Sequence, residues 1–157
     1  MRVILLQLCF LAACACAKDA AIALQDVPKP VMDALRKEYP ENKLISTGMR
    51  SVDGKPKYYD LEVQWNGKGT IDVYIDVEGS IIATGTAINV KRIPAAVIAA
   101  IQAKYPGWKM SEFEREVNFK TKAVFFSIDV SKDGKSFEIE VDTTGTILKE
   151  QPNAVEK

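Results

Sequence analysis

Apolar residues recur at helical spacing in two short stretches of the chain, and prolines mark where each stretch begins and ends. Val31, Leu35 and Tyr39 are each four positions apart, which places them on one face of an α-helix. Pro28 and Pro40 flank this run, and proline is tolerated at the start of a helix but not in its interior. We therefore predict an amphipathic helix of about three turns. The same pattern predicts a second helix from Pro94, Val97, Ile101, Tyr105 and Pro106.

After each predicted helix the spacing of apolar residues changes to two, as expected for strands with one buried face. Tyr59, Leu61 and Val63 alternate with more polar residues, and Asn66-Gly67 follows as a hairpin turn signal. Strands that are joined by such short turns pair antiparallel. The pattern predicts strands at residues 43–50, 58–65, 70–76 and 80–86 in the first half and 109–118, 122–131, 136–142 and 146–150 in the second.

The two halves of the chain repeat one another. Val27-Pro28 recurs as Ile93-Pro94, 66 residues later, and the rest of each half follows with nearly the same offset. We predict an α+β fold of two tandem α-β-β-β-β repeats, residues 27–88 and 93–149, each with one helix on one face of an antiparallel sheet. The link between them has no flexible Gly/Ser tract, so we expect the two sheets to abut as one rigid body. Residues 150–157 are predicted to be a polar tail.

The N-terminus has the pattern of an export signal, residues 1–17. Arg2 precedes an apolar stretch that is too short to span a bilayer, which needs about 20 residues. Two processing sites remain open: cleavage after Ala17, or a lipoprotein signal that ends before Cys14, because Leu11-Ala12-Ala13-Cys14 resembles a bacterial lipobox. We expect a periplasmic or cell-envelope protein that contacts the membrane only if Cys14 carries a lipid anchor.

The chain contains no histidine, and its three cysteines, Cys9, Cys14 and Cys16, all lie in the export signal. The mature domain therefore lacks the usual general base at neutral pH, Cys-His nucleophiles and His- or Cys-based zinc sites. Without Arg2 it has 20 basic and 21 acidic residues, so no basic surface would attract nucleic acid. We expect a protein that is not an enzyme and uses no cofactor or metal.

Acidic residues on the predicted strand faces leave carboxylate chemistry formally open. Asp72 and Asp76 share one face of a strand, and Glu138, Glu140 and Asp142 share a face of another. We interpret them as solvated charges or turn residues, because the Asp-x-x-Gly pattern of Asp142 recurs at Asp76. A weak cation site on this acidic face stays an open alternative.

The sheet face away from the helices is the candidate interaction surface. By alternation Tyr58 and Tyr74 lie on this face from neighbouring strands, and Phe125 is the repeat partner of Tyr58. With Asp60 and Glu62 they form a mixed aromatic and polar surface that is typical of protein-binding patches. The alternative is that the rings only cover one another across strands, which contributes roughly 0.2–1 kcal/mol per pair.

The repeated pattern resembles the PepSY-like family of exported bacterial proteins, whose tandem form looks like the beta-lactamase inhibitory protein (BLIP) fold. The matching positions are helix boundaries, core residues and turns, so they concern architecture and mark no site. They are Val27, Pro28, Val31, Ala34, Leu35, Tyr39, Pro40, Tyr59, Leu61, Val63, Asn66, Gly67, Asp76 and Gly79 in the first copy and Ile93, Pro94, Val97, Ala100, Tyr105, Pro106, Gly134, Asp142 and Gly145 in the second. The resemblance implies an exported, non-enzymatic domain that binds or inhibits another protein, often an enzyme.

Two functional hypotheses follow. In the first, the open sheet face binds a protein, with an envelope enzyme or peptidase among the candidate partners. In the second, the groove between the repeats holds a small ligand or a cation in the periplasm. No residue of the chain matches an inhibitory hot spot of the resembling family, so the hypotheses rest on the surface just described.

Overall fold

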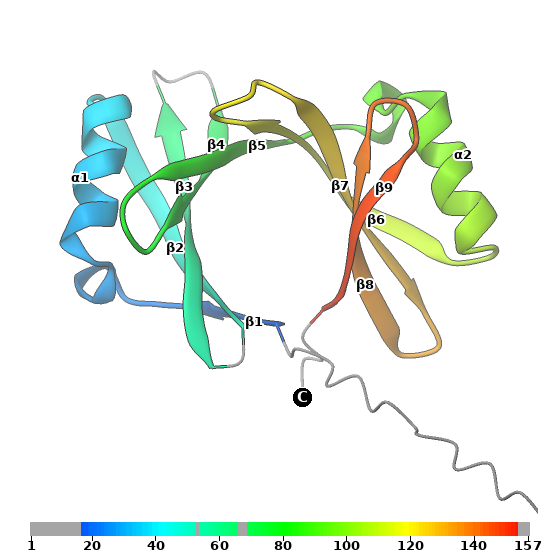
Figure 1. The fold of residues 1–157 in the computed structure, drawn as a ribbon, viewed down its shortest axis with the longest axis horizontal. Helices are drawn as coiled ribbons and strands as arrows, with labels where there is room; N and C mark the ends of the chain where they lie inside the picture. The colour runs from blue at the N-terminus through cyan, green and yellow to red at the C-terminus, as the bar shows by residue number, and fades with distance from the viewer. Residues whose placement is uncertain (1–16, 53, 66–68, 154–157) are drawn as a thin grey trace, which may run out of the picture.

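The computed structural model describes residues 17–52, 54–65 and 69–153, and in these ranges two helices lie on one side of a single sheet (Figure 1). Its nine strands pair antiparallel, and their order in the sheet is their order in the chain. The predicted α+β class is confirmed. The strands are β1 (Ala17–Ala21), β2 (Asn42–Val52), β3 (Lys55–Trp65), β4 (Thr70–Asp76), β5 (Ile81–Ala87), β6 (Lys109–Asn118), β7 (Val124–Lys132), β8 (Lys135–Asp142) and β9 (Ile147–Pro152); the helices are α1 (Lys29–Glu38) and α2 (Ala95–Lys104), preceded by the 3₁₀ turns η1 (Leu24–Asp26) and η2 (Val90–Arg92).

The two halves of the chain share one continuous sheet, so the expectation of two abutting four-stranded sheets is wrong. Strand β5 of the first half pairs with β6 of the second, from Ala83 opposite Asn118 to Ala87 opposite Glu114. The chain crosses over through α2 and returns β6 to the edge of β5, where the backbone groups of both strands find hydrogen-bond partners. Figure 1 shows the sheet as an arch that carries α1 and α2 on its outer side.

Each helix covers its own half of the sheet through an aliphatic core. Val31 and Leu35 of α1 are fully buried against strand residues such as Leu61 and Val73. Burying each such side chain stabilises the fold by roughly 1.5–3 kcal/mol. Both helices have ten residues, close to the three turns that the spacing predicted. No helix in the described ranges is long and apolar enough to cross a membrane. The second core consists of Ile93, Val97, Ile101, Phe126, Ile128, Val130, Ile139 and Val141.

Both ends of the sheet differ from the sequence-based expectation. Strand β1 was not predicted, and it pairs with β2 along the edge of the sheet. The predicted polar tail, residues 150–157, begins inside β9, where Gln151 is buried and donates a hydrogen bond from Nε2 to Glu138 Oε1 at 2.9 Å. Neither segment has a clear apolar alternation, so its sequence does not predict a strand. Both segments are held in the sheet by backbone pairing with a neighbouring strand.

Several predictions fall outside the described residues. They are residues 1–16 of the export signal, which include Cys14, the Asn66-Gly67 turn and residues 154–157.

The turn between β8 and β9 shows why the Asp-x-x-Gly pattern recurs. The Asp142 carboxylate accepts hydrogen bonds from the Thr144 hydroxyl and from the amides of Thr144 and Thr146, at 2.7, 2.8 and 2.9 Å, and these bonds lower the pKa of Asp142. Gly145 has a φ of +94°, and a Cβ there would lie 2.7 Å from the carbonyl oxygen of Ala96 in α2. The turn role predicted for Asp142 and Gly145 is confirmed.

We expect Gly145→Ala to lower the free energy of unfolding more than Gly134→Ala does. Both glycines have a positive φ, +94° and +75°, so alanine strains the backbone at either position. Gly134 has no atom within 4 Å of the added Cβ, whereas Gly145 faces the backbone of α2. The crowding should therefore cost Gly145→Ala about 1–3 kcal/mol beyond the backbone strain. Urea unfolding of both variants measures the difference; equal losses would show that the turn does not press against α2.

Candidate binding groove on the concave face

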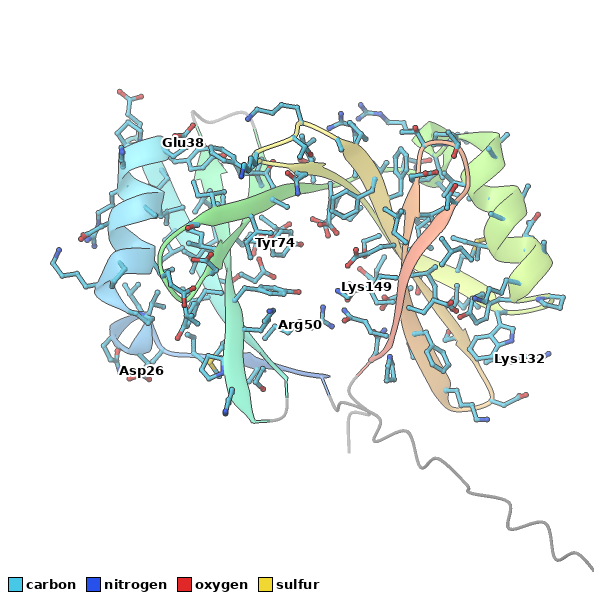
Figure 2. All side chains as sticks on the ribbon, in the orientation of Figure 1. Asp26, Glu38, Arg50, Tyr74, Lys132 and Lys149 are labelled. Carbon is cyan, nitrogen blue, oxygen red and sulfur yellow. The ribbon has the colours of Figure 1, made fainter. Side chains whose placement is uncertain are left out.

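The concave side of the arch holds a groove of about 930 Å³, to which all nine strands contribute residues. We call this surface the concave groove. Figure 2 shows Arg50, Tyr74 and Lys149 directed into the space that the arch encloses, whereas Asp26 and Lys132 lie at the outer edges of the molecule. The helices occupy the opposite face of the sheet, so the concave groove is the face that the fold leaves uncovered.

Strand register determines which side chains reach the concave groove. Asp60, Tyr74 and Ala83 stand opposite one another across β3, β4 and β5, and all three line it. Ala83 and Gly85, the small residues of β5, leave room for longer side chains on the neighbouring strands. The carboxyl group of Glu114 on β6 lies over Gly85 on β5 and leaves no space for a Cβ at that position.

The structure brings together four of the five predicted interaction residues. Tyr58, Asp60, Tyr74 and Phe125 line the concave groove, while Glu62 does not and instead accepts a hydrogen bond from Ser46 Oγ at 3.0 Å. The rings of Tyr58 and Tyr74 meet edge to face, with centroids 5.8 Å apart. The two rings therefore cover one another in part and also line the groove, and their role in partner binding stays a prediction.

A buried ion pair links the two arms of the arch. Arg50 on β2 is only 5 % exposed, and its Nη1 lies 3.1 Å from Glu138 Oε2 on β8. The same nitrogen donates to the Tyr58 hydroxyl at 2.9 Å, and Gln151 donates to Glu138. Sequence reasoning missed Arg50, because its partner is 88 positions away along the chain.

Glu114 on β6 is a half-buried carboxyl group with an altered proton affinity. Its Oε2 accepts a hydrogen bond from the Tyr74 hydroxyl at 3.1 Å, and its Oε1 lies buried, where it accepts no hydrogen bond from the described residues. Burial, followed by the nearby charge of Asp72, raises the pKa of Glu114 to about 8. Burial also raises the pKa of Asp72. These two carboxyl groups therefore hold a proton near neutral pH that isolated carboxylates would release.

Glu116, two residues further along β6, is a buried carboxyl group that lines the groove. It is 8 % exposed, and its side chain has no hydrogen bond or ion pair with any residue in the described ranges. Burial raises the pKa of Glu116 to about 9, with further contributions from Glu114, Glu140 and Glu138, while Lys149 acts in the opposite direction. Sequence reasoning missed Glu116. A comparison of the two repeats could have found it, because Glu116 occupies the position in the second repeat that Arg50 has in the first, 66 residues earlier.

The side chains that line the concave groove are of kinds that bind ligands or other proteins. Within residues 17–52, 54–65 and 69–153 no three His, Cys, Asp or Glu side chains converge in a way that could hold a metal ion. The groove offers aromatic rings, two exposed aliphatic side chains and buried carboxyl groups on a rigid sheet. Surfaces that combine these groups bind proteins and amphipathic ligands.

A family model described as "Putative beta-lactamase-inhibitor-like, PepSY-like" matches the chain twice, at residues 14–83 and 81–149. The chain belongs to the PepSY-like family. The resemblance inferred from the sequence is thus confirmed, and the two matches overlap only at residues 81–83, within β5.

Solved structures of similar fold come from Bacteroides species. A BLIP-like protein from Bacteroides fragilis is 22 % identical, with 83 % of this chain and 88 % of that chain covered and a TM-score of 0.53. A DUF2874 family protein from Bacteroides uniformis is 22 % identical over 80 % of this chain and 88 % of that one, with a TM-score of 0.57. A protein from Bacteroides eggerthii described among "putative periplasmic proteins" is 21 % identical, with 80 % and 88 % covered and a TM-score of 0.56. No curated protein matches the chain.

We expect Arg50→Met to lower the free energy of unfolding by about 3 kcal/mol, because it leaves the Glu138 carboxylate among other acidic groups without its cation. The control is Lys149→Met, which removes a more exposed pair with Glu140, in which the Lys149 side chain is 44 % exposed. That change should cost less than about 1 kcal/mol. Urea unfolding at neutral pH compares the two variants. A loss in Arg50→Met no larger than in the control would show that the pair does not hold the arms together.

We expect Glu116→Gln to make the PepSY-like protein less sensitive to alkaline pH. The pKa of Glu116 rises from 4.5 to about 9 on folding, so its contribution to stability is complete below about pH 4.5 and is lost as the pH rises through about 9. Glutamine resembles the protonated acid, so near pH 9 the variant should be more stable than the wild type by roughly 2–4 kcal/mol.

Thermal unfolding between about pH 5 and pH 9 measures this difference. Glu112→Gln, which changes an exposed glutamate of the same strand, is the control and should follow the wild type at every pH. A stability difference for Glu116→Gln that does not change with pH would contradict the assigned protonation.

Proposed function

We propose that this PepSY-like protein is an exported, non-enzymatic protein of the cell envelope that binds or inhibits another protein through the concave groove. The single observation that carries the proposal is the groove itself, an uncovered sheet face of nine strands that gathers aromatic, aliphatic and ionisable side chains. A partner that inserted a loop or an edge there would bury these groups without any change in the fold.

Two apolar side chains give the concave groove its candidate anchor points. Ile82 and Leu148 line it and remain 37 % and 55 % exposed, and they occupy equivalent positions 66 residues apart in the two repeats. The rings of Tyr58, Tyr74 and Phe125 line the same groove, together with ionisable groups. Aromatic and aliphatic anchors surrounded by polar groups are the usual source of affinity in protein interfaces.

Export is supported by the N-terminal signal and by the relative from Bacteroides eggerthii, which is described among "putative periplasmic proteins". In the envelope the chain would be either a soluble periplasmic protein processed after Ala17 or a lipoprotein anchored through Cys14. A non-enzymatic role is supported by the lack of histidine in the whole chain and by the BLIP-like description of the family.

The volume of the concave groove favours a second candidate function, the binding of a small ligand. About 930 Å³ lies within the usual range for ligand pockets, roughly 300–1,000 Å³. A small ligand would raise the melting temperature by mass action, whereas a protein partner would be retained by the immobilised chain. The two functions therefore give different results in the experiment below.

We expect Ile82→Ser combined with Leu148→Ser to reduce the capture of a protein partner from envelope extract by at least about tenfold, because the change removes both apolar anchors. The matched control is Leu24→Ser combined with Ile45→Ser, which changes two apolar residues that are 53 % and 50 % exposed and do not line the groove. Quantitative mass spectrometry of proteins retained by each immobilised chain measures the effect, and the melting temperature of each chain verifies its folding.

Equal capture by all three chains would contradict a role for the concave groove in protein binding. If no protein is retained but a small molecule raises the melting temperature of the wild type and not of the groove variant, the second function is correct instead.

A further inference from the structure

The two repeats place opposite charges at equivalent positions of the concave groove. Arg50 stands opposite Tyr58 across β2 and β3, and Glu116 stands opposite Phe125 across β6 and β7. Tyr58 and Phe125 are themselves repeat partners. Each repeat therefore presents one buried charged side chain beside one aromatic ring, a cation in the first repeat and a carboxyl group in the second.

The cation of the first repeat has partners within the chain. Arg50 pairs with Glu138, donates to the Tyr58 hydroxyl and lies 5.9 Å from the centroid of the Tyr58 ring. It thus combines an ion pair with a contact to an aromatic ring, an arrangement that stabilises a cation away from water.

The carboxyl group of the second repeat has no such arrangement within the described residues. Glu116 is more than nine-tenths buried, lines the concave groove and has neither a hydrogen bond nor an ion pair there. Phenylalanine replaces tyrosine opposite it, so the hydroxyl group that could have donated a hydrogen bond is missing. A buried carboxyl group without a partner is costly to the fold, which points to a group that the chain itself does not supply.

The charges around Glu116 indicate what that group is. The lining of the concave groove contains seven carboxyl side chains and three cationic ones. Two of the three cations, Arg50 and Lys149, already pair with Glu138 and Glu140, and the third, Lys57, is exposed on β3. The groove therefore has an excess of acidic groups around Glu116, and a cation would be complementary to it.

We propose that the concave groove takes up a lysine or arginine side chain of the partner protein, whose cationic group pairs with Glu116 beside Glu114 and lies against the ring of Phe125. This inference rests on the function proposed above and specifies the chemistry of the partner. The long apolar stem of such a side chain fits a groove that also exposes Ile82 and Leu148.

A bare metal ion matches the site less well than an organic cation does. Calcium takes six to eight oxygen ligands, and no three acidic side chains converge on one point in the described part of the chain. An ammonium or guanidinium group needs fewer acceptors and also gains from an adjacent aromatic ring.

Binding of a cation should be linked to proton release. The carboxyl groups that face Glu116 are Glu114 on its own strand and Glu138 and Glu140 on β8, with Lys149 on β9 as the opposing charge. Burial, followed by these neighbouring charges, raises the pKa of Glu116 to about 9, so its side chain is protonated at neutral pH. A bound cation favours the carboxylate, and the affinity should therefore increase as the pH rises from about 6 to about 9.

The experiment uses the exported chain and two capped peptides, acetyl-Ala-Leu-Lys-Leu-Ala-amide and the same peptide with norleucine in place of lysine. Norleucine keeps the apolar stem and removes the charge. Titrations followed by backbone amide NMR give the dissociation constant and locate the bound peptide. Isothermal titration calorimetry in two buffers of different ionisation enthalpy gives the number of protons released.

We expect the lysine peptide to bind at least about tenfold more tightly than the norleucine peptide, to shift the amides around residues 114–116 and to release protons. Glu116→Gln should abolish that preference, and Glu112→Gln, an exposed glutamate on the same strand, should retain it. Glu116→Gln is close in shape to the protonated acid, so it should fold, and its amide spectrum verifies this.

Equal binding of the two peptides, or no binding of the lysine peptide at millimolar concentration, would overturn the proposal. The same holds if Glu116→Gln keeps the preference, or if CaCl₂ alone displaces the peptide and reproduces its shifts. If both peptides bind equally to the wild type and neither binds to the chain with Ile82→Ser and Leu148→Ser, the preference for a cationic side chain is wrong. The groove would then still be a protein-binding site. Selective lysine binding without any captured protein would instead contradict only the proposed function.

Discussion

The pairing of β5 with β6 is the constraint on which the rest of the structure depends. These two strands belong to different repeats, and their backbone hydrogen bonds turn two small helix-on-sheet units into one sheet of nine strands. Neighbouring strands in a sheet are rotated by about 20–25° on average, and this twist accumulates with the number of strands. A sheet of this length therefore curls, and both helices pack on the same side of it. The concave groove is the result, because it is the face on which no helix packs.

Ionisable groups on the inner surface of the arch lose hydration on folding, which costs free energy, whereas the aliphatic core under the helices has no such cost. The helix-facing side of the sheet carries aliphatic residues such as Leu61 and Val130, which need no hydrogen-bond partner. The groove side holds ionisable groups in partly dry surroundings, where an unpaired charge is costly. Arg50 and Glu138 meet this requirement across the arms of the arch, whereas Glu116 remains protonated near neutral pH. The buried side-chain atoms without a hydrogen-bond partner in the described residues, on Arg50, Asp60 and Glu114, all belong to residues that line the groove.

The duplication separates residues that build the scaffold from residues that distinguish its copies. Positions such as Gly79 and Gly145 agree because each turn passes close to the backbone of a helix, and only glycine fits there. In the groove the copies differ, as in Arg50 against Glu116 or Tyr74 against Glu140. A sheet face exposed to solvent or a partner tolerates such changes, because the strand pairing beneath it is made by the backbone. Any specific activity of this chain is therefore expected in the residues that differ between the copies.

The sequence alone determined the α+β class, the two helices, most strands and the turns at residues 77–79, 133–134 and 143–145, because each of these depends on spacing and on residue types that are neighbours in the chain. It also indicated that Tyr58, Asp60, Tyr74 and Phe125 share a face, since alternation decides that locally. Tertiary structure alone decided that the repeats form one sheet, that β1 and the end of β9 complete it, and that Glu62 accepts a hydrogen bond from Ser46 and is not among the residues that line the groove. It also decided the pairing of Arg50 with Glu138 and the isolation of Glu116, because both depend on groups from strands that are distant in sequence and meet only when the sheet curls.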